Sequence, residues 1–185
     1  MLDKITPRLK KTFIILAVFL GIAVALNLIV LELFDQKSLY RAEHSLVGII
    51  MLMGFFITFS DIKTSRSKII SLFLLSLVPC YFGTVFSDLD IVLLGIGGHR
   101  NPLFHSGIFF FILLFVVRRY KSIPLAAIIA AFGIGLGSHL IWDLFDHADV
   151  RWISGGTLDR FWIGTNGLLC FVLAKIFLSS RLKKS

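Results

Sequence analysis

Charged residues are scarce in this chain of 185 residues: Asp, Glu, Lys and Arg together make up 16%, whereas 57% of the residues are hydrophobic. The mean hydropathy of +0.89 lies outside the range of soluble globular domains. By our segmentation no polar segment exceeds about 20 residues, against roughly 50 for a small domain. The composition therefore excludes a separate soluble domain and predicts one transmembrane domain over residues 1–185.

Cysteine is also scarce, and the spacing of Cys80 and Cys170 forms no metal or redox motif. Because both lie within apolar runs, we expect buried, unpaired thiols. There is no internal repeat. The formal net charge of +8 does not indicate nucleic-acid binding, since the basic residues are divided among short segments rather than gathered on one face.

Apolar runs are the dominant feature of what is present. A membrane-spanning helix needs about 20 apolar residues, and the runs predict an all-α, polytopic membrane protein with about six transmembrane helices. Ser122 and Pro124 are typical of a helix start. Gly133 and Gly137 have the spacing that allows close helix packing. The expected helices cover residues 12–34, 45–60, 69–86, 103–117, 122–145 and 161–179.

Lys and Arg set the expected orientation. With the N-terminus in the cytoplasm, the inside segments carry 13 of them and the outside segments five. This asymmetry predicts that both termini are cytoplasmic. Lys175, near the inner end of the last helix, is expected to extend toward the interface. Trp152 and Trp162 are expected to anchor the outer interface.

Ionisable residues gather at the outer ends of the later helices. His139 and Asp143 are four residues apart and project from one face of a helix. Asp88 and Asp90, in an extended segment, are expected to point to one side. Ionisable groups at membrane depth are costly and tend to be paired and functional. The candidate metal ligands are Asp88, Asp90, His99, His105, His139 and Asp143.

Imidazole and carboxylate ligands suit a divalent metal, zinc first and manganese or iron next. Six ligands suffice for one or two ions, as in two-metal hydrolases. His44 is expected at the interface, and Asp146 and His147 in a hydrated loop. Taken singly, each residue also fits an ordinary packing or loop role.

Taken in their order along the chain, these short motifs resemble the bacterial membrane-bound metal-dependent hydrolase family (YdjM-like), which is distantly similar to zinc-dependent phospholipase C and P1-type nucleases. The resemblance covers residues 87–143 and is carried by Asp-x-Asp at Asp88 and Asp90, His99-Arg100, His105-Ser106, and Gly135 through His139 to Asp143. It implies phosphoester hydrolysis at a metal centre.

We therefore expect a hydrolase of the bacterial cytoplasmic (inner) membrane that acts on a lipid or lipid-linked phosphoester at the extracytoplasmic face. Asp88 or Asp90 would accept the proton of a metal-activated water, and Arg100 would hold a phosphate oxygen. The alternatives are an ion or metal transporter, a metal-binding membrane protein without hydrolytic activity, and haem binding through His105 and His139.

Overall fold

The computed structural model describes residues 2–33, 40–59, 65–145, 150 and 157–183. Over these residues the chain is all-helical, with seven α-helices, one short 3-10 helix and no strand. The elements are α1 (Leu2–Leu33), α2 (Tyr40–Ile57), α3 (Arg66–Phe86), α4 (Leu89–Leu94), η2 (Ile96–Gly98), α5 (Ile108–Val117), α6 (Ile123–Phe145) and α7 (Thr157–Leu182).

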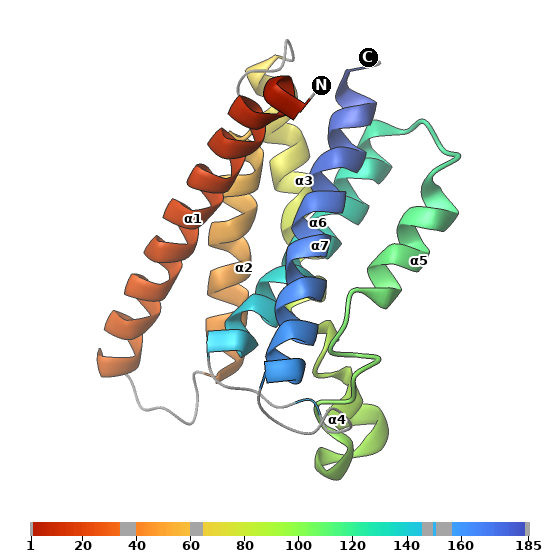
Figure 1. Ribbon diagram of the computed structural model, residues 1–185. Helices are drawn as coiled ribbons and strands as arrows, with labels where there is room; N and C mark the ends of the chain where they lie inside the picture. The colour runs from red at the N-terminus through yellow and green to blue at the C-terminus, as the bar shows by residue number, and fades with distance from the viewer. Residues whose placement is uncertain (1, 34–39, 60–64, 146–149, 151–156, 184–185) are drawn as a thin grey trace.

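The long helices form a bundle in which successive helices run in opposite directions (Figure 1). The start of α1 and the end of α7 lie at one end of the bundle, at the top of Figure 1. The starts of α2, α5 and α7 and the ends of α3 and α6 point toward the opposite end, where α4 lies. We call this opposite end the α4 end. Segments far apart in the sequence therefore meet there.

Helix α6 is the centre of the bundle and packs against α2, α3, α5 and α7. The sequence signal for its start is confirmed, because the Ser122 hydroxyl accepts a hydrogen bond from the Leu125 N–H (3.3 Å). Fourteen of its 23 residues are buried, including His139 and Asp143 near its C-terminal end. A central helix of this kind fixes these two side chains against several neighbours at once.

Three glycines allow the neighbours of α6 to approach closely. A Cβ at Gly133 would overlap the ring of Phe110 on α5, and one at Gly137 would crowd the backbone of α7. A Cβ at Gly135 would overlap the carbonyl of Cys80 on α3. The prediction that Gly133 and Gly137 serve close packing is confirmed, and the structure adds Gly135 as the contact with α3.

Three helices, α3, α6 and α7, are long and apolar enough to cross a membrane, whereas Glu43–Ile57 of α2 and all of α5 form shorter apolar helices. The expected helix over 103–117 was wrong in its first part, since α5 begins only at Ile108. At 1.5 Å per residue α5 is about 15 Å long, half the hydrocarbon thickness. Residues 103–107 form turns in which a serine hydroxyl binds backbone groups instead.

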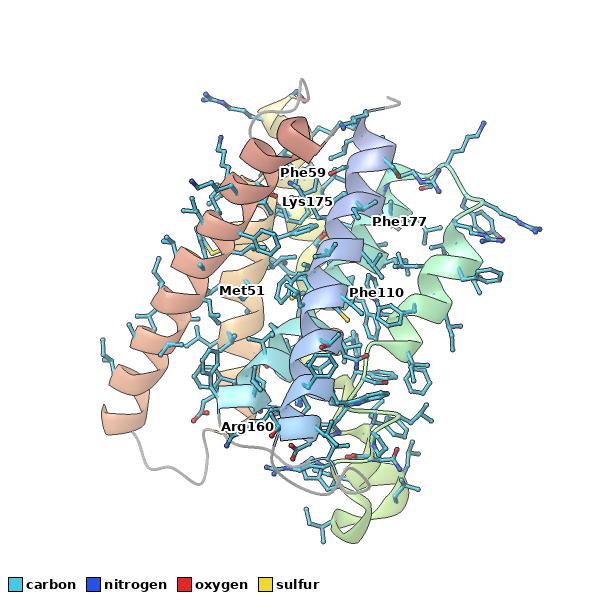
Figure 2. The ribbon with its side chains drawn as sticks, in the orientation of Figure 1. Met51, Phe59, Phe110, Arg160, Lys175 and Phe177 are labelled. Carbon is cyan, nitrogen blue, oxygen red and sulfur yellow. The ribbon has the colours of Figure 1, made fainter. Side chains whose placement is uncertain are left out.

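Both cysteines are free and buried, as expected. Lys175 does not simply extend toward the interface. Its ammonium group donates to the carbonyl (2.9 Å) and the hydroxyl of Thr58, just past the end of α2, and lies 3.5 Å from the ring centre of Phe59. Figure 2 shows Lys175 and Phe59 near the end opposite α4. The charge thereby satisfies a carbonyl group at the C-terminal end of α2.

Candidate metal centre

Four of the five histidines of the chain come together at the α4 end. The fifth, His147, and Asp146 lie outside the described residues. The side chains fall into two groups. Within each group the potential ligand atoms all lie within 4.8 Å of one another. The first group is His44, His139 and Asp143; the second is Asp88, His99 and His105.

The first group joins α2 to α6. Asp143 lies one helical turn beyond His139, and its Oδ2 is 3.3 Å from His139 Nε2. His44, in the first turns of α2, stacks on His139 with ring centres 4.1 Å apart, and its Nε2 is 3.9 Å from Asp143 Oδ1. His44 is therefore part of the site and not only an interfacial residue. The available signal was its position at the outer end of a predicted helix.

A backbone carbonyl of α3 fixes the orientation of the His139 ring. Its Nδ1 lies 2.7 Å from the carbonyl oxygen of Thr84 on α3. A carbonyl only accepts hydrogen bonds, so Nδ1 carries the proton and donates it. In the neutral ring Nε2 then presents its lone pair toward Asp143, which is the arrangement seen in metal-ligating histidines.

The second group is formed by the chain that leaves α3 and returns to α5. Asp88 follows α3, His99 follows η2, and His105 lies in the turn before α5. Ring centres of His99 and His105 are 5.3 Å apart. Burial raises the pKa of Asp88. Burial, together with the neighbouring His139, lowers the pKa of His105 to about 4, so its imidazole is neutral near pH 7, as metal binding requires.

Asp90 lies behind this group rather than in it. Its Oδ1 is 3.0 Å from His99 Nδ1, and its Oδ2 accepts the backbone N–H of Asn101 (2.9 Å). The carboxylate is fully buried. It therefore holds the His99 ring with Nε2 turned away from it, the role of a carboxylate that orients a metal-binding histidine.

The expectation of an extended segment around Asp88 and Asp90 was wrong, because α4 begins at Leu89. Successive helical residues are rotated by about 100°, so residues two apart point in nearly opposite directions. The two aspartates accordingly diverge: Asp88 lies among the candidate ligands and Asp90 lies behind His99. Gly95, with φ of 74°, ends α4 in a conformation that favours glycine.

His105 connects the two groups. Its Nε2 is 3.6 Å from Asp143 Oδ2, and its Nδ1 is 3.4 Å from Asp90 Oδ2. The side chain is 1% exposed. The predicted residues Asp88, His99, His105, His139 and Asp143 are thus brought into one cluster.

Helix α7 holds the turn that carries His105. The indole N–H of Trp162 donates to the His105 carbonyl (3.1 Å), and the Asn166 side chain accepts the backbone N–H of Gly107 (2.9 Å). On the other side, the Ser87 hydroxyl donates to the carbonyl of residue 104 (3.2 Å). Trp162 is therefore a support of the site in addition to any interfacial role. Nothing in its sequence context indicated this contact, because it joins residues 57 positions apart. Trp152 lies outside the described residues.

Arg100 follows His99 and is half-buried. Its backbone has φ of 63°, the only positive value at a non-glycine residue in the part of the chain that the structure describes. Such a conformation is costly and is often associated with functional sites. The assignment of Arg100 to phosphate binding stays a prediction.

The donor set fits a divalent cation. Within the described residues, buried nitrogens of His44, His105 and His139 have no hydrogen-bond partner. Buried polar atoms are rarely left unsatisfied, and several such nitrogens beside carboxylates form a donor set that a cation would satisfy. A proton on His139 Nε2 would satisfy only one of them. Nitrogen and carboxylate oxygen ligands match zinc, manganese or iron.

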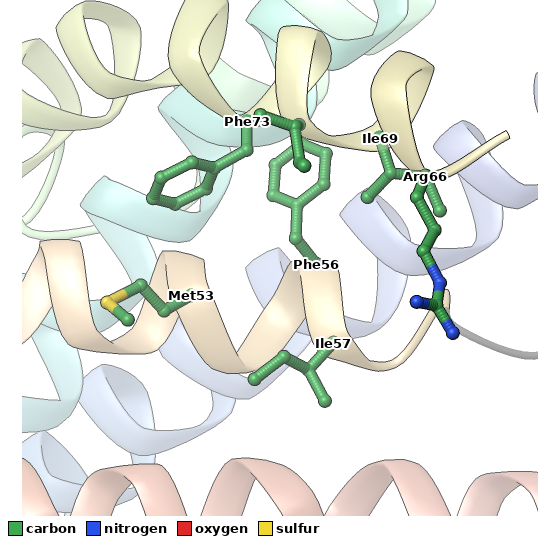
Figure 3. A pocket seen from close by; sticks show the side chains of 7 residues that line it. Met53, Phe56, Ile57, Arg66, Ile69 and Phe73 are labelled. Atoms are coloured by element: carbon green, nitrogen blue, oxygen red, sulfur yellow. The ribbon is translucent and has the colours of Figure 1, made fainter.

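A groove of about 440 Å³ lies between α2 and α3, away from this cluster (Figure 3). Its lining contains neither imidazole nor carboxylate, so we do not assign chemistry to it. The lining residues are Met53, Phe56, Ile57, Arg66, Ile69, Ile70 and Phe73.

Fold and cluster together define a class of protein: a helical protein with three helices long and apolar enough to cross a membrane and a buried His–Asp cluster at one end. More particularly, the chain belongs to the family described as a domain of unknown function (DUF5942), whose model matches residues 67–185. The matched region contains α3 except its first residue and the predicted ligands from Asp88 to Asp143, whereas His44 lies outside it. No curated protein and no solved structure matches the chain.

Proposed function

We propose that this protein is a membrane-embedded, metal-dependent hydrolase that acts on a lipid or lipid-linked phosphoester. The observation that supports the proposal is the pair of adjoining ligand groups, joined through His105 and Asp143 at 3.6 Å. Two adjoining groups of mixed imidazole and carboxylate ligands are typical of two-metal hydrolases. The proposal includes zinc as the first choice of metal, manganese or iron as the next, and one or two ions.

The metal ligands in this proposal are His44, His139 and Asp143 on one side and Asp88, His99 and His105 on the other. When bound, a divalent ion supplies Lewis acidity, which lowers the pKa of water and neutralises charge on a phosphoester. Asp90 and the Thr84 carbonyl keep the rings of His99 and His139 in their binding orientation.

Asp88 is the carboxylate that we assign to proton transfer, through the oxygen that does not bind the metal. It is half-buried, whereas Asp90 is fully buried and already accepts two hydrogen bonds. A proton acceptor must be within reach of the reacting water, which favours the more accessible group. Arg100, adjacent to His99, would bind a phosphate oxygen through its guanidinium group.

Our proposal places the protein in the bacterial cytoplasmic membrane with six crossings, both termini in the cytoplasm and the cluster facing the extracytoplasmic side. The charge distribution supports this orientation. The described ends of α3 and α7 that carry Arg66, Lys68 and Arg181 lie opposite the α4 end. A lipid substrate would then reach the cluster from the outer leaflet.

Metal content of the detergent-purified protein is the first test, measured by elemental mass spectrometry. We expect one or two equivalents of zinc, manganese or iron in the wild type and a clear loss in Asp143→Asn. Asp159→Asn is the matched control, because Asp159 is also buried, at the start of α7, but belongs to neither ligand group. Equal metal content in all three proteins, after exposure to each metal, would refute the proposal.

Hydrolysis is the second test. Metal-loaded protein should release phosphate or a phosphorylated headgroup from phospholipids in mixed micelles, and chelation should abolish this until zinc is restored. Metal binding without hydrolysis of any phosphoester would favour the alternative, a metal-binding protein or transporter. Uptake of metal into proteoliposomes would identify a transporter, although transport sites usually lie near the bilayer midplane rather than at one end of a bundle.

A further inference from the structure

The ten residues Leu89–Gly98, which comprise α4 and η2, expose an unusually apolar surface. Val92, Leu93 and Ile96 are 75%, 65% and 72% exposed. The single ionisable residue of this segment, Asp90, is fully buried behind His99. The segment therefore turns its charge inward and its hydrocarbon outward, the reverse of a segment that faces water.

The loop between α5 and α6 shows how this chain builds a segment that faces water. Residues 118–121 read Arg-Arg-Tyr-Lys, and all four are exposed. This loop lies at the other end of the bundle (Figure 1). The contrast is within one protein, so the apolar exterior of Leu89–Gly98 is not a general property of its connections.

Lipid is the occupant that the neighbouring elements indicate. The segment lies between α3 and α5 in the chain, and both expose large apolar side chains, among them Phe82 (60%) near the end of α3 and Ile112 (53%) in α5. The apolar exterior of Leu89–Gly98 thus continues surfaces that face hydrocarbon in a membrane-spanning protein. No exposed charge in the segment would attract an acidic partner or a phosphate.

We propose that Leu89–Gly98 inserts into the bilayer interface on the side of the His–Asp cluster. The segment begins directly after Asp88 and ends directly before His99, two of the candidate ligands. Insertion would place both ligands at the boundary between lipid and water. Interfacial amphipathic helices lie about 5–10 Å deep at the headgroup boundary, and we expect a similar depth here. This part of the inference rests on the proposed hydrolase: insertion makes a membrane lipid, rather than a water-soluble phosphoester, the favoured substrate.

Site-directed fluorescence tests the insertion. Val92→Cys and Ile96→Cys are labelled with an NBD maleimide and reconstituted into phosphatidylcholine–phosphatidylglycerol vesicles. The two native cysteines are fully buried, so we expect the maleimide not to label the wild type. Lys121→Cys is the matched control for water, and Ile112→Cys, 53% exposed on α5, is the matched control for hydrocarbon.

We expect emission at positions 92 and 96 to shift to the blue and to be quenched by acyl-chain spin-labelled lipid, with the quenching by iodide several-fold weaker than at position 121. Iodide quenching equal to that at position 121 would overturn the proposal. All four positions are exposed, so the substitutions leave the core intact. Leu93→Cys is a further position should one variant fail to fold.

Activity separates this inference from the proposed function. A Val92→Asp/Ile96→Asp variant should keep its metal, while its ratio of activity on vesicle phospholipid to activity on a soluble phosphodiester falls at least tenfold. A metal-loaded wild type that hydrolyses neither substrate refutes the hydrolase but leaves the quenching result valid. Hydrolysis with water-exposed probes at 92 and 96 refutes the insertion alone.

Discussion

Asp90→Asn tests whether the buried aspartate orients a metal ligand or binds metal itself. In the wild type one carboxylate oxygen accepts from His99 Nδ1 at 3.0 Å and the other from the Asn101 N–H at 2.9 Å. An amide has the same shape but only one acceptor oxygen, and its nitrogen only donates. The backbone N–H of Asn101 cannot change, so the amide oxygen is expected to face it.

The amide nitrogen then faces His99 Nδ1, which has to accept a hydrogen bond. The ring proton moves to Nε2, the atom that the wild type keeps free for a metal. Loss of a partner that orients a metal-binding histidine lowers metal affinity by about 10–100-fold. That range corresponds to about 1.4–2.7 kcal/mol of binding free energy. His99→Ala, by contrast, removes a ligand and should abolish one equivalent of binding.

Competition with a chromophoric zinc chelator in detergent measures the affinity, and elemental mass spectrometry measures the stoichiometry. Asp90→Asn should keep the wild-type stoichiometry at saturating zinc but bind it 10–100-fold more weakly. Asp159→Asn, the same chemical change at another buried carboxylate, should leave both unchanged. Should Asp90→Asn lose a full equivalent, as His99→Ala is expected to, Asp90 is a direct ligand; an unchanged affinity would refute the orienting role.

Three further predictions concern packing and support of the cluster. Gly135→Ala should lower the free energy of unfolding by about 1–3 kcal/mol, because its methyl group would overlap the backbone of α3. Thermal unfolding in detergent measures this change, and Gly21→Ala is the control that should not destabilise, since nothing lies within 4 Å of a Cβ there. Trp162→Phe should weaken zinc binding in the chelator assay, because it removes a hydrogen bond to the His105 carbonyl worth about 0.5–1.5 kcal/mol. Unchanged affinity would show that this hydrogen bond does not position the turn. Lys175→Met should lower the melting temperature without changing metal content, because it removes the charged donor at the end of α2; a loss of metal would contradict the separation of the two ends.

Much of the candidate site could be predicted because helix ends are strongly constrained. His139 and Asp143 share a helix face at a spacing of four residues, and the structure places them 3.3 Å apart. The Lys and Arg distribution assigned the ends of three helices to one side, which predicted that residues 88, 90, 99, 105, 139 and 143 converge. Five of them form the two ligand groups with His44, and Asp90 lies behind His99. These inferences depend only on helix periodicity and on the number of crossings.

Interactions across the bundle could not be predicted in this way. The partners of His44 and Trp162 lie 95–99 and 57 residues away, and no periodicity relates such positions. His44 occupies the first turns of α2, where its side chain could face lipid, water or α6 with equal sequence support. Only the packing of α2 against α6 determines that it stacks on His139.

Helix α4 is the element that the sequence did not predict and that most affects the geometry of the candidate site. A six-residue helix is shorter than the roughly two turns needed for a periodic signal, and its sequence, Leu-Asp-Ile-Val-Leu-Leu, also fits an extended segment. As a helix it turns Asp90 toward His99 and Val92 to the opposite side, because the two residues are rotated by about 200°. The same short element therefore orients a candidate ligand on one face and, in the proposed insertion, presents hydrocarbon to the bilayer on the other. A rotation of α4 that buried the exposed face of Val92 would also withdraw Asp90 from His99. In the proposed arrangement, contact with the membrane and the geometry of the candidate metal centre are thus coupled through a single turn and a half of helix.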